Sequence, residues 1–178
     1  IVGFMKAGSG NDYARGVQNF NSYEEIVAFM RKNEHLKKWI DVATIESKSL
    51  NKLFVNNCGL GFDAYVAELV NQSKVKKFLN KLHIGKLCYV YLMLRALLSY
   101  KPFQLEIEID DYRKQQFDNV WFLAISNQPY FGGGMKISPD SKIEDGQIEV
   151  TIVHNLPGWK FLILFLTVYK GAHLKYKE

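Results

Sequence analysis

Three glycine-rich segments carry the residues of this chain that are best suited to bind a phosphate group or a metal ion. They span residues 7–15, 56–64 and 127–146. Glycine lets the backbone approach a ligand closely, and backbone N–H groups beside a helix N-terminus suit an anionic phosphate. Each segment could instead be a turn that needs glycine for a positive φ. Taken singly, the segments leave both interpretations open.

The first segment offers a set of candidate phosphate ligands. Gly8 and Gly10 bring backbone N–H groups, and Ser9 brings a hydroxyl. Asn11 or Asp12 can begin a helix whose N-terminus would face the same ligand. The segment is neither a Walker A loop, because no Gly-Lys-Ser/Thr follows, nor a GxGxxG fingerprint.

The third segment combines a run of three glycines with carboxylates. Asp140, Glu144 and Asp145 offer the hard oxygen ligands that Mg²⁺ and Ca²⁺ prefer, although their spacing is not that of an EF-hand loop. The pair Asp145-Gly146 could equally be a hairpin turn. In the second segment, Asp63 suits the first turn of a helix, and a simple turn explains its glycines as well.

Hydrophobic periodicity predicts the elements that must position these segments. Helical spacing is expected after Asp12, after the capping-box residue Ser22, through Tyr65 to Leu69, over 87–100 and after Gly158. Alternation and β-branched residues predict one strand that ends at Phe4. They predict further strands over 39–47, 50–56, 104–110, 119–127 and 147–153. The pattern is that of an α+β protein in which most strands are antiparallel.

Composition is that of an ordinary globular chain. Apolar residues make up 48% of the 178 residues, and the net charge is +5, which is compatible with an anionic membrane surface but does not require nucleic acid. Cys58 and Cys88 lie in no CxxC or Cys/His cluster. The apolar run 161–169, which contains Thr167, is too short to span a membrane, which takes about 20 residues.

Taken together, the three segments are far more specific than any one alone. Gly-Ser-Gly-Asn-Asp-x-Ala-Arg, then Asn-x-x-Gly-x-Gly-Phe-Asp-Ala, then Asn-x-x-x-x-Gly-Gly-Gly-Met-x-Ile-x-Pro occur in this order. The order and spacing resemble the diacylglycerol kinase catalytic family, which includes bacterial lipid kinases and sphingosine kinases. The resemblance covers nearly the whole chain, from Gly3 to about His173.

The resemblance implies a two-lobed enzyme. Residues 1–38 would be the end of an α/β ATP-binding lobe, and residues 39–178 a mainly antiparallel β-sandwich lipid-binding lobe with inserted helices. It places Ser9 toward the nucleotide. It also makes Asp145 the side-chain ligand of a structural Mg²⁺, to which Lys142 and Gln147 contribute backbone carbonyls.

Several departures from the family pattern limit what the chain can do by itself. Lys6 stands where the family often has proline, and Ser9 stands where it usually has threonine. No Gly-Gly-Asp-Gly phosphate loop occurs, and the family's presumed general base would fall beyond Glu178. The chain is therefore expected to be a fragment that lacks most of the ATP lobe and the C-terminal end, to contain no catalytic residue, and to be inactive alone.

The expected function is ATP- and Mg²⁺-dependent phosphorylation of the hydroxyl of diacylglycerol or a related neutral lipid. Two alternatives stay open, namely a non-catalytic lipid-binding domain and a nucleotide kinase of the NAD kinase type. A cytoplasmic, peripherally membrane-associated protein without a transmembrane segment is expected, and a homodimer is possible. The lysine-rich stretch 74–86 is either a solvated helix face or a membrane-surface patch.

Overall fold

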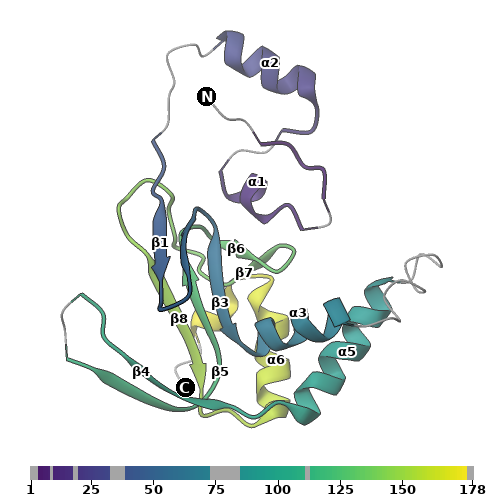
Figure 1. Ribbon diagram of the computed structural model, residues 1–178. Helices are drawn as coiled ribbons and strands as arrows, with labels where there is room; N and C mark the ends of the chain where they lie inside the picture. Colours follow the sequence, from purple (N-terminus) through teal and green to yellow (C-terminus); the bar gives the residue numbers. More distant parts are fainter. Residues whose placement is uncertain are drawn as a thin grey trace. The chain divides into compact units, whose positions relative to one another are not determined.

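The chain folds as an α+β protein with mainly antiparallel strands, as expected (Figure 1). The computed structural model describes residues 4–8, 10–17, 20–32, 39–72, 85–110 and 113–175, and for 85–90 the backbone only. The helical elements are α1 (Asp12–Gly16), α2 (Tyr23–Lys32), α3 (Phe62–Gln72), α5 (Gly85–Ser99), α6 (Gly158–Val168) and the 3₁₀ helix η1 (Ala172–Lys175). The strands are β1 (Ala43–Glu46), β2 (Asn51–Phe54), β3 (Asn57–Gly61), β4 (Phe103–Ile107), β5 (Gln115–Ser126), β6 (Tyr130–Phe131), β7 (Met135–Lys136) and β8 (Glu149–His154).

The strands form one four-stranded sheet and two hairpins. The sheet has the order β3-β5-β4, and β8 also pairs with β5. β4 and β5 are antiparallel, with a bulge between Phe103 and Leu105. β1 and β2 form one antiparallel hairpin, in which Ala43 lies opposite Phe54, and β6 and β7 form another. The long strand β5 is the only one of these that carries a continuous buried run, residues 120–124.

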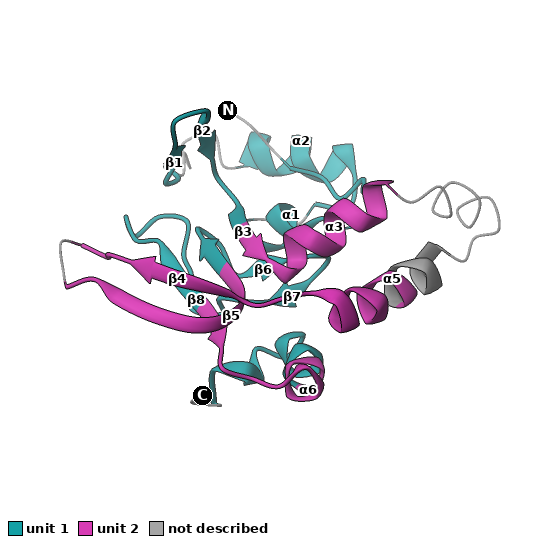
Figure 2. Cartoon of the chain, turned by 60° about the horizontal axis from the view of Figure 1, so that its bottom comes forward, with its two compact units in different colours: residues 1–58, 124–151, 164–177 teal, residues 59–123, 152–163, 178 magenta. Residues whose placement is uncertain are grey.

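The chain divides into two compact units, each built from segments that are far apart in the sequence (Figure 2). Unit 1 comprises Ile1–Cys58, Ala124–Thr151 and Leu164–Lys177. Unit 2 comprises Gly59–Leu123, Ile152–Ile163 and Glu178. The expected lobe boundary between residues 38 and 39 stays a prediction.

Unit 2 is held together by an aromatic cluster. The ring of Phe62, the first residue of α3, contacts Tyr100, Trp121 and Phe161 at centroid distances of 5.1–6.1 Å. Trp121 stacks on Phe161, and its indole N–H donates a 2.7 Å hydrogen bond to the carbonyl of Leu156. Such packing buries large apolar surfaces while satisfying the one polar atom of the indole.

Unit 1 has a smaller apolar core, formed where the loop after β7 meets the C-terminal segment. Met135, Ile137, Ile143 and Val168 are buried there. The ring of the buried His173 hydrogen-bonds to the Ile137 carbonyl over 2.8 Å through Nε2. Among the described residues, His173 therefore has a structural role, since it ties the C-terminal segment to the backbone at Ile137.

Most elements lie where the sequence predicts them, and two features differ. Residues 57–61 were expected as part of a glycine turn, but they form strand β3. Asn11 was a candidate helix cap, but it adopts a left-handed conformation with φ of 57° and makes no capping hydrogen bond to α1. The expected strand end at Ile1–Phe4 and the stretch 74–86 lie largely outside the described residues.

None of the helices in the described ranges is both long and apolar enough to cross a membrane.

Candidate functional site

The first glycine segment is shaped by the side chain of Asn11 rather than by a helix cap. Asn11 Oδ1 accepts hydrogen bonds from the backbone N–H groups of Ala7 and Gly8, at 3.2 and 2.9 Å. Its amide nitrogen donates back to the Gly8 carbonyl over 2.6 Å. The side chain thus closes the turn before α1. Of the predicted nucleotide ligands, Gly8, Gly10 and Asn11 lie in this turn and Asp12 is the first residue of α1, while Ser9 lies outside the described residues.

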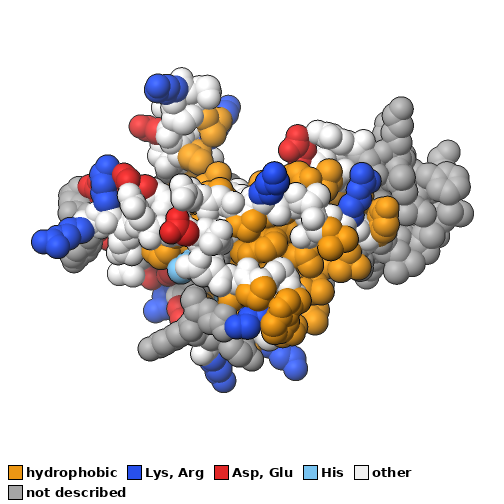
Figure 3. All heavy atoms as spheres, turned by 90° about the horizontal axis from the view of Figure 1, so that it is seen from below, with side chains coloured by type: hydrophobic (Ala, Val, Ile, Leu, Met, Phe, Trp, Pro, Cys, Tyr) orange, Lys and Arg blue, Asp and Glu red, His pale blue; other side chains and the backbone are white. Residues whose placement is uncertain are grey.

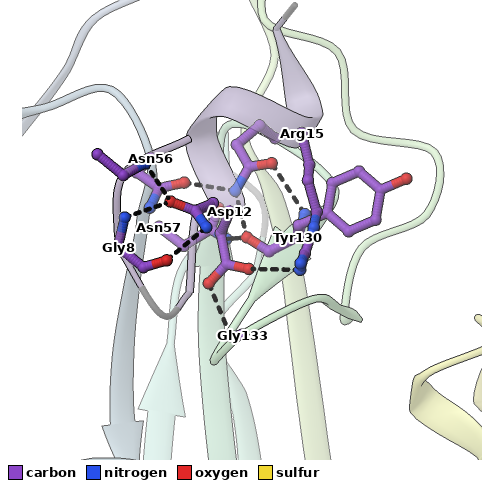
Figure 4. A network of polar contacts seen from close by, with 10 residues as sticks. Gly8, Asp12, Arg15, Asn56, Asn57, Tyr130 and Gly133 are labelled. Carbon is purple, nitrogen blue, oxygen red and sulfur yellow. Dashed lines mark hydrogen bonds and ion pairs between the residues drawn. The ribbon is translucent and has the colours of Figure 1, made fainter. Parts of the chain in front are cut away.

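Asp12 joins the first glycine segment to the third (Figure 4). Its Oδ2 accepts a 2.8 Å hydrogen bond from the backbone N–H of Gly133, in the loop between β6 and β7. Its Oδ1 is buried and has no hydrogen-bond partner among the described residues, although Arg15 Nη1 lies 3.8 Å away. Two segments that the sequence suggested separately therefore meet at one carboxylate.

Arg15 brings a cation to the same place. Its side chain is about one-third exposed and lies against the triple-glycine loop: a Cβ added to Gly134 would stand 2.2 Å from Arg15 Nη1. Gly134 also has a φ of 105°, which favours glycine. The sequence motif contains Arg15, but its role as a site residue was missed, because only the fold brings it to a loop 119 residues away.

The second and third segments are also joined, by the side-chain amides of Asn57 in β3 and of Gln128 just after β5. The Asn57 side chain donates a 2.7 Å hydrogen bond to the Tyr130 carbonyl. The Gln128 amide, which is fully buried, donates to Asn56 and to the Tyr130 carbonyl and accepts from the Tyr130 N–H. A buried amide with several partners fixes the backbone that it bonds, so Gln128 holds Tyr130 at the start of the loop that carries the three glycines.

The predicted metal loop is present in unit 1, although its ligand set stays a prediction. Asp145 Oδ1 accepts a 3.1 Å hydrogen bond from the N–H of Gln147, and the adjacent Gly146 N–H donates to Asp41 Oδ2 over 2.8 Å. Asp41 also pairs with this loop through its own backbone, since its N–H donates to the Ile143 carbonyl. Lys142 lies on the same loop and has an exposed side chain.

The donor chemistry of this loop fits a divalent cation of the hard type. One carboxylate and nearby backbone carbonyls are the oxygen ligands that Mg²⁺ accepts, usually together with water. The described residues hold no group of three or more His, Cys, Asp or Glu side chains that could bind a metal. The predicted set has only one carboxylate, Asp145, so the absence of such a group does not test it.

Asp63 is a candidate that sequence reasoning treated only as a helix-start residue. It lies in the first turn of α3, in unit 2, and its Oδ1 is buried without a hydrogen-bond partner among the described residues. Burial raises the pKa of its carboxyl above the ordinary 3.8, opposed by hydrogen bonds from the N–H groups of Ala64 and of Asp63 itself. Burial and the nearby Asp63 charge likewise raise the pKa of Tyr100.

The signal that could have revealed Asp63 is its neighbourhood in sequence. Asp63 directly follows Gly61-Phe62. If Phe62 enters the core, the neighbouring carboxylate of Asp63 must lose part of its contact with water. Perturbed carboxyls of this kind occur often at functional sites. A helix-start role alone would leave the carboxylate in water.

Comparison with known proteins identifies a matching family and several relatives of this chain. Residues 56–178 match the family described as the YegS C-terminal NAD kinase beta sandwich-like domain. One relative is YtlR of Bacillus subtilis (strain 168), a lipid kinase by name, which is 31% identical over 176 residues. A diacylglycerol kinase of Mycobacterium tuberculosis is 26% identical over 182 residues, and one of Bacillus subtilis 25% over 175 residues.

These alignments cover 97–99% of this chain but only 53–57% of the relatives, so the chain spans about half the length of the curated relatives it matches. The family match extends over more than half of the chain. The chain therefore belongs to the diacylglycerol/lipid kinase family, within which it carries the YegS-type C-terminal β-sandwich-like domain.

Proposed function

We propose that the protein containing this chain is an ATP-dependent lipid kinase that phosphorylates the hydroxyl of diacylglycerol or a related neutral lipid. The family and the names of the relatives support a kinase that acts on lipid. The observation that carries the assignment to this chain is the meeting of the Gly8–Asp12 turn, the Gly132–Gly134 loop and Arg15 in unit 1.

This arrangement has the parts that a phosphate site needs. Phosphoryl transfer depends mainly on positioning and on stabilising negative charge. Two glycine-rich backbones and a guanidinium converge, and Asp12 fixes one of these backbones against the other. Gly8, Ser9, Gly10, Asn11 and Asp12 would line the nucleotide site, with the Asp12 carboxylate holding Gly133 rather than a phosphate. Arg15 would offset the charge of the phosphates.

Asp145 would hold a structural Mg²⁺ through its side chain, with the backbone carbonyls of Lys142 and Gln147. The ion would supply a fixed positive charge that shapes the loop entering β8. Asp41, which accepts from the Gly146 N–H, would position that loop. No residue of this chain is assigned as the general base.

The surroundings of Asp63 favour a lipid acceptor over a polar one. Its partnerless carboxylate oxygen lies in the unit that carries the aromatic cluster of Phe62, Tyr100, Trp121 and Phe161. Such an oxygen can accept a hydrogen bond from the hydroxyl of an otherwise apolar molecule. A nucleotide acceptor, as in the NAD kinase alternative, would need more polar partners.

The remaining parts of the proposal concern the setting of the enzyme. A neutral diacyl lipid resides in a bilayer, so the protein would act at a membrane surface, as a peripheral cytoplasmic protein that binds no nucleic acid. The proposed oligomeric state is a homodimer.

The test uses the full-length protein with labelled ATP and three acceptors: diacylglycerol in mixed micelles, sphingosine in mixed micelles, and NAD in solution. We expect phosphate transfer to diacylglycerol, and ATP rather than GTP as the donor. Transfer to NAD alone would support the nucleotide kinase alternative. Lipid binding without transfer to any acceptor would support the non-catalytic alternative.

A further inference from the structure

Helix α5 leaves one apolar face uncovered. Tyr91, Leu94 and Leu98 are exposed and, at spacings of three and four residues, lie on the same side of the helix. Leu98 is 90% exposed, whereas Leu92 and Ala96 on the other side are buried. The surface of a soluble protein rarely exposes several large apolar side chains side by side unless that surface binds a partner, a ligand or a membrane.

The start of helix α6 in the same unit has the same property. Trp159 and Ile163 are exposed on one side, while Phe161 on the other is buried against Trp121. The two helix ends are neighbours, because a Cβ added to Gly158 would lie 3.8 Å from Leu97. Figure 3, the view from below, shows hydrophobic side chains gathered over a broad area with Lys and Arg side chains around it.

The charges on these segments all have one sign. Within residues 91–103 and 155–163 the side chains that carry a charge at neutral pH are Arg95, Lys101 and Lys160, and neither segment contains Asp or Glu. Exposed apolar side chains that include Trp and Tyr, with basic residues beside them, match the interface of an anionic bilayer. An apolar protein partner would not require this bias of charge.

We propose that these five side chains, Tyr91, Leu94, Leu98, Trp159 and Ile163, form an α5–α6 surface that inserts into anionic lipid bilayers. The proposal deepens the proposed function, because a bilayer-resident acceptor requires the enzyme to enter the interface. The apolar side chains supply the insertion, and Arg95, Lys101 and Lys160 supply attraction to lipid phosphates.

The test measures binding of the full-length protein to vesicles of phosphatidylglycerol and phosphatidylcholine, with brominated lipids that quench tryptophan fluorescence. We expect quenching of the wild-type protein that is largely lost in Trp159→Phe. Trp39→Phe is the matched control, since Trp39 is also highly exposed but lies in unit 1. We expect Trp39→Phe to leave the quenching in place.

A second pair of variants measures affinity. Leu98→Ser combined with Ile163→Ser should weaken vesicle binding about tenfold or more, since two exposed aliphatic side chains leave the bilayer. Leu53→Ser, an exposed leucine on β2, should leave binding within about twofold. Equal binding by the double variant and the control would overturn the proposal, as would quenching that survives Trp159→Phe.

Two other partners could cover the α5–α6 surface, and each would give a distinct experimental result. A second copy of the chain would give self-association that the double variant abolishes without any change in vesicle binding. Another segment of the same polypeptide would make Trp159 inaccessible to acrylamide in the absence of lipid. Either result overturns bilayer insertion.

Turnover of a short-chain, water-soluble diacylglycerol separates this proposal from the proposed function. The double variant should keep that activity within about twofold while losing activity on vesicles. If the wild-type protein turns over neither form of the lipid, the proposed function fails, and the quenching experiment still decides bilayer insertion.

Discussion

The carboxylate of Asp12 accepts a 2.8 Å hydrogen bond from the backbone N–H of Gly133, 121 residues further along the chain. The carboxylate is mostly buried, with 13% of the side-chain surface exposed. A hydrogen bond to a charged, shielded acceptor is stronger than one between neutral groups. The geometry of the triple-glycine loop therefore depends on the charge of a residue in α1.

Replacing Asp12 with Ala should lower the free energy of unfolding by about 1.5–3 kcal/mol, the usual range for hydrogen bonds to charged groups. Asp12→Asn should lose less, because an amide oxygen can still accept from Gly133. Urea unfolding of both variants measures the difference. Glu46→Gln, an exposed change on β1, is the control, and a loss in Asp12→Ala no greater than in that control would contradict the role of Asp12.

Gly133 and Gly134 offer a matched pair of alanine substitutions. Both have φ near +100°, so each alanine should cost about 1–3 kcal/mol of stability through backbone strain. A Cβ on Gly133 would meet nothing within 4 Å, whereas one on Gly134 would collide with Arg15.

Only Gly134→Ala should therefore displace the guanidinium. We expect it to raise the KM for ATP about tenfold more than Gly133→Ala does, as the loss of one charge-assisted contact would. Steady-state kinetics of the full-length protein measure this. Equal KM values in the two variants would show that Arg15 does not serve the nucleotide.

Asp145→Asn should raise the Mg²⁺ concentration required for half-maximal activity about tenfold or more, because a neutral amide is a poorer ligand for a hard cation. ATP affinity at saturating Mg²⁺ should change little, since this ion would be distinct from the one bound to ATP. Glu108→Gln, an exposed carboxylate outside this loop, is the control. An unchanged Mg²⁺ dependence in Asp145→Asn would remove the proposed ligand.

Asp63 should make stability depend on pH in a defined direction. Burial raises the pKa of its carboxyl in the folded protein above the ordinary 3.8, so the folded state binds this proton more tightly than the unfolded state does. The stability that it contributes is complete below pH 3.8 and is lost as the pH rises through the folded pKa.

Asp63→Asn should therefore be more stable than the wild type at neutral pH, and the advantage should shrink as the pH falls toward 3.8. Denaturant unfolding of both proteins across this pH range gives the difference in their free energies of unfolding. The contributions of the other carboxyl groups are the same in both proteins and drop out of this difference. A gap that stays constant with pH would mean that Asp63 is not desolvated.

Local sequence signals predicted much of the fold. One half of the capping box predicted before α2 is confirmed, since Ser22 Oγ accepts from the Glu25 N–H. The other half differs, because the Glu25 carboxylate accepts from the N–H of Asn21, one residue before Ser22. The strands predicted from alternation around β4 and β8 are both present, and burial alternates along β4 but not along β8. Helix α6 also ends before Gly171, as expected. Pro102 follows the end of α5, as expected.

What the sequence did not show depends on contacts between distant residues. Asn and Gly have low strand propensity, so the sequence of Asn57–Gly61 indicates a turn, yet tertiary pairing with β5 makes it a strand. Asn11 looked like a cap because its type is common there, but it closes the preceding turn instead. The approach of Arg15 to Gly134 is set by the fold, and no local pattern encodes it.

The interleaving of the two compact units has a consequence for synthesis on the ribosome. Unit 1 contains Ile1–Cys58 but also needs Leu164–Lys177, which is translated after all of Gly59–Leu123. At the usual rates of translation, the segment Ile1–Cys58 emerges roughly 5–20 s before that last part exists. During this interval its apolar residues lack their final neighbours, so the nascent chain is a natural client for chaperones, and faster or slower codons between the two segments would change the yield of folded protein.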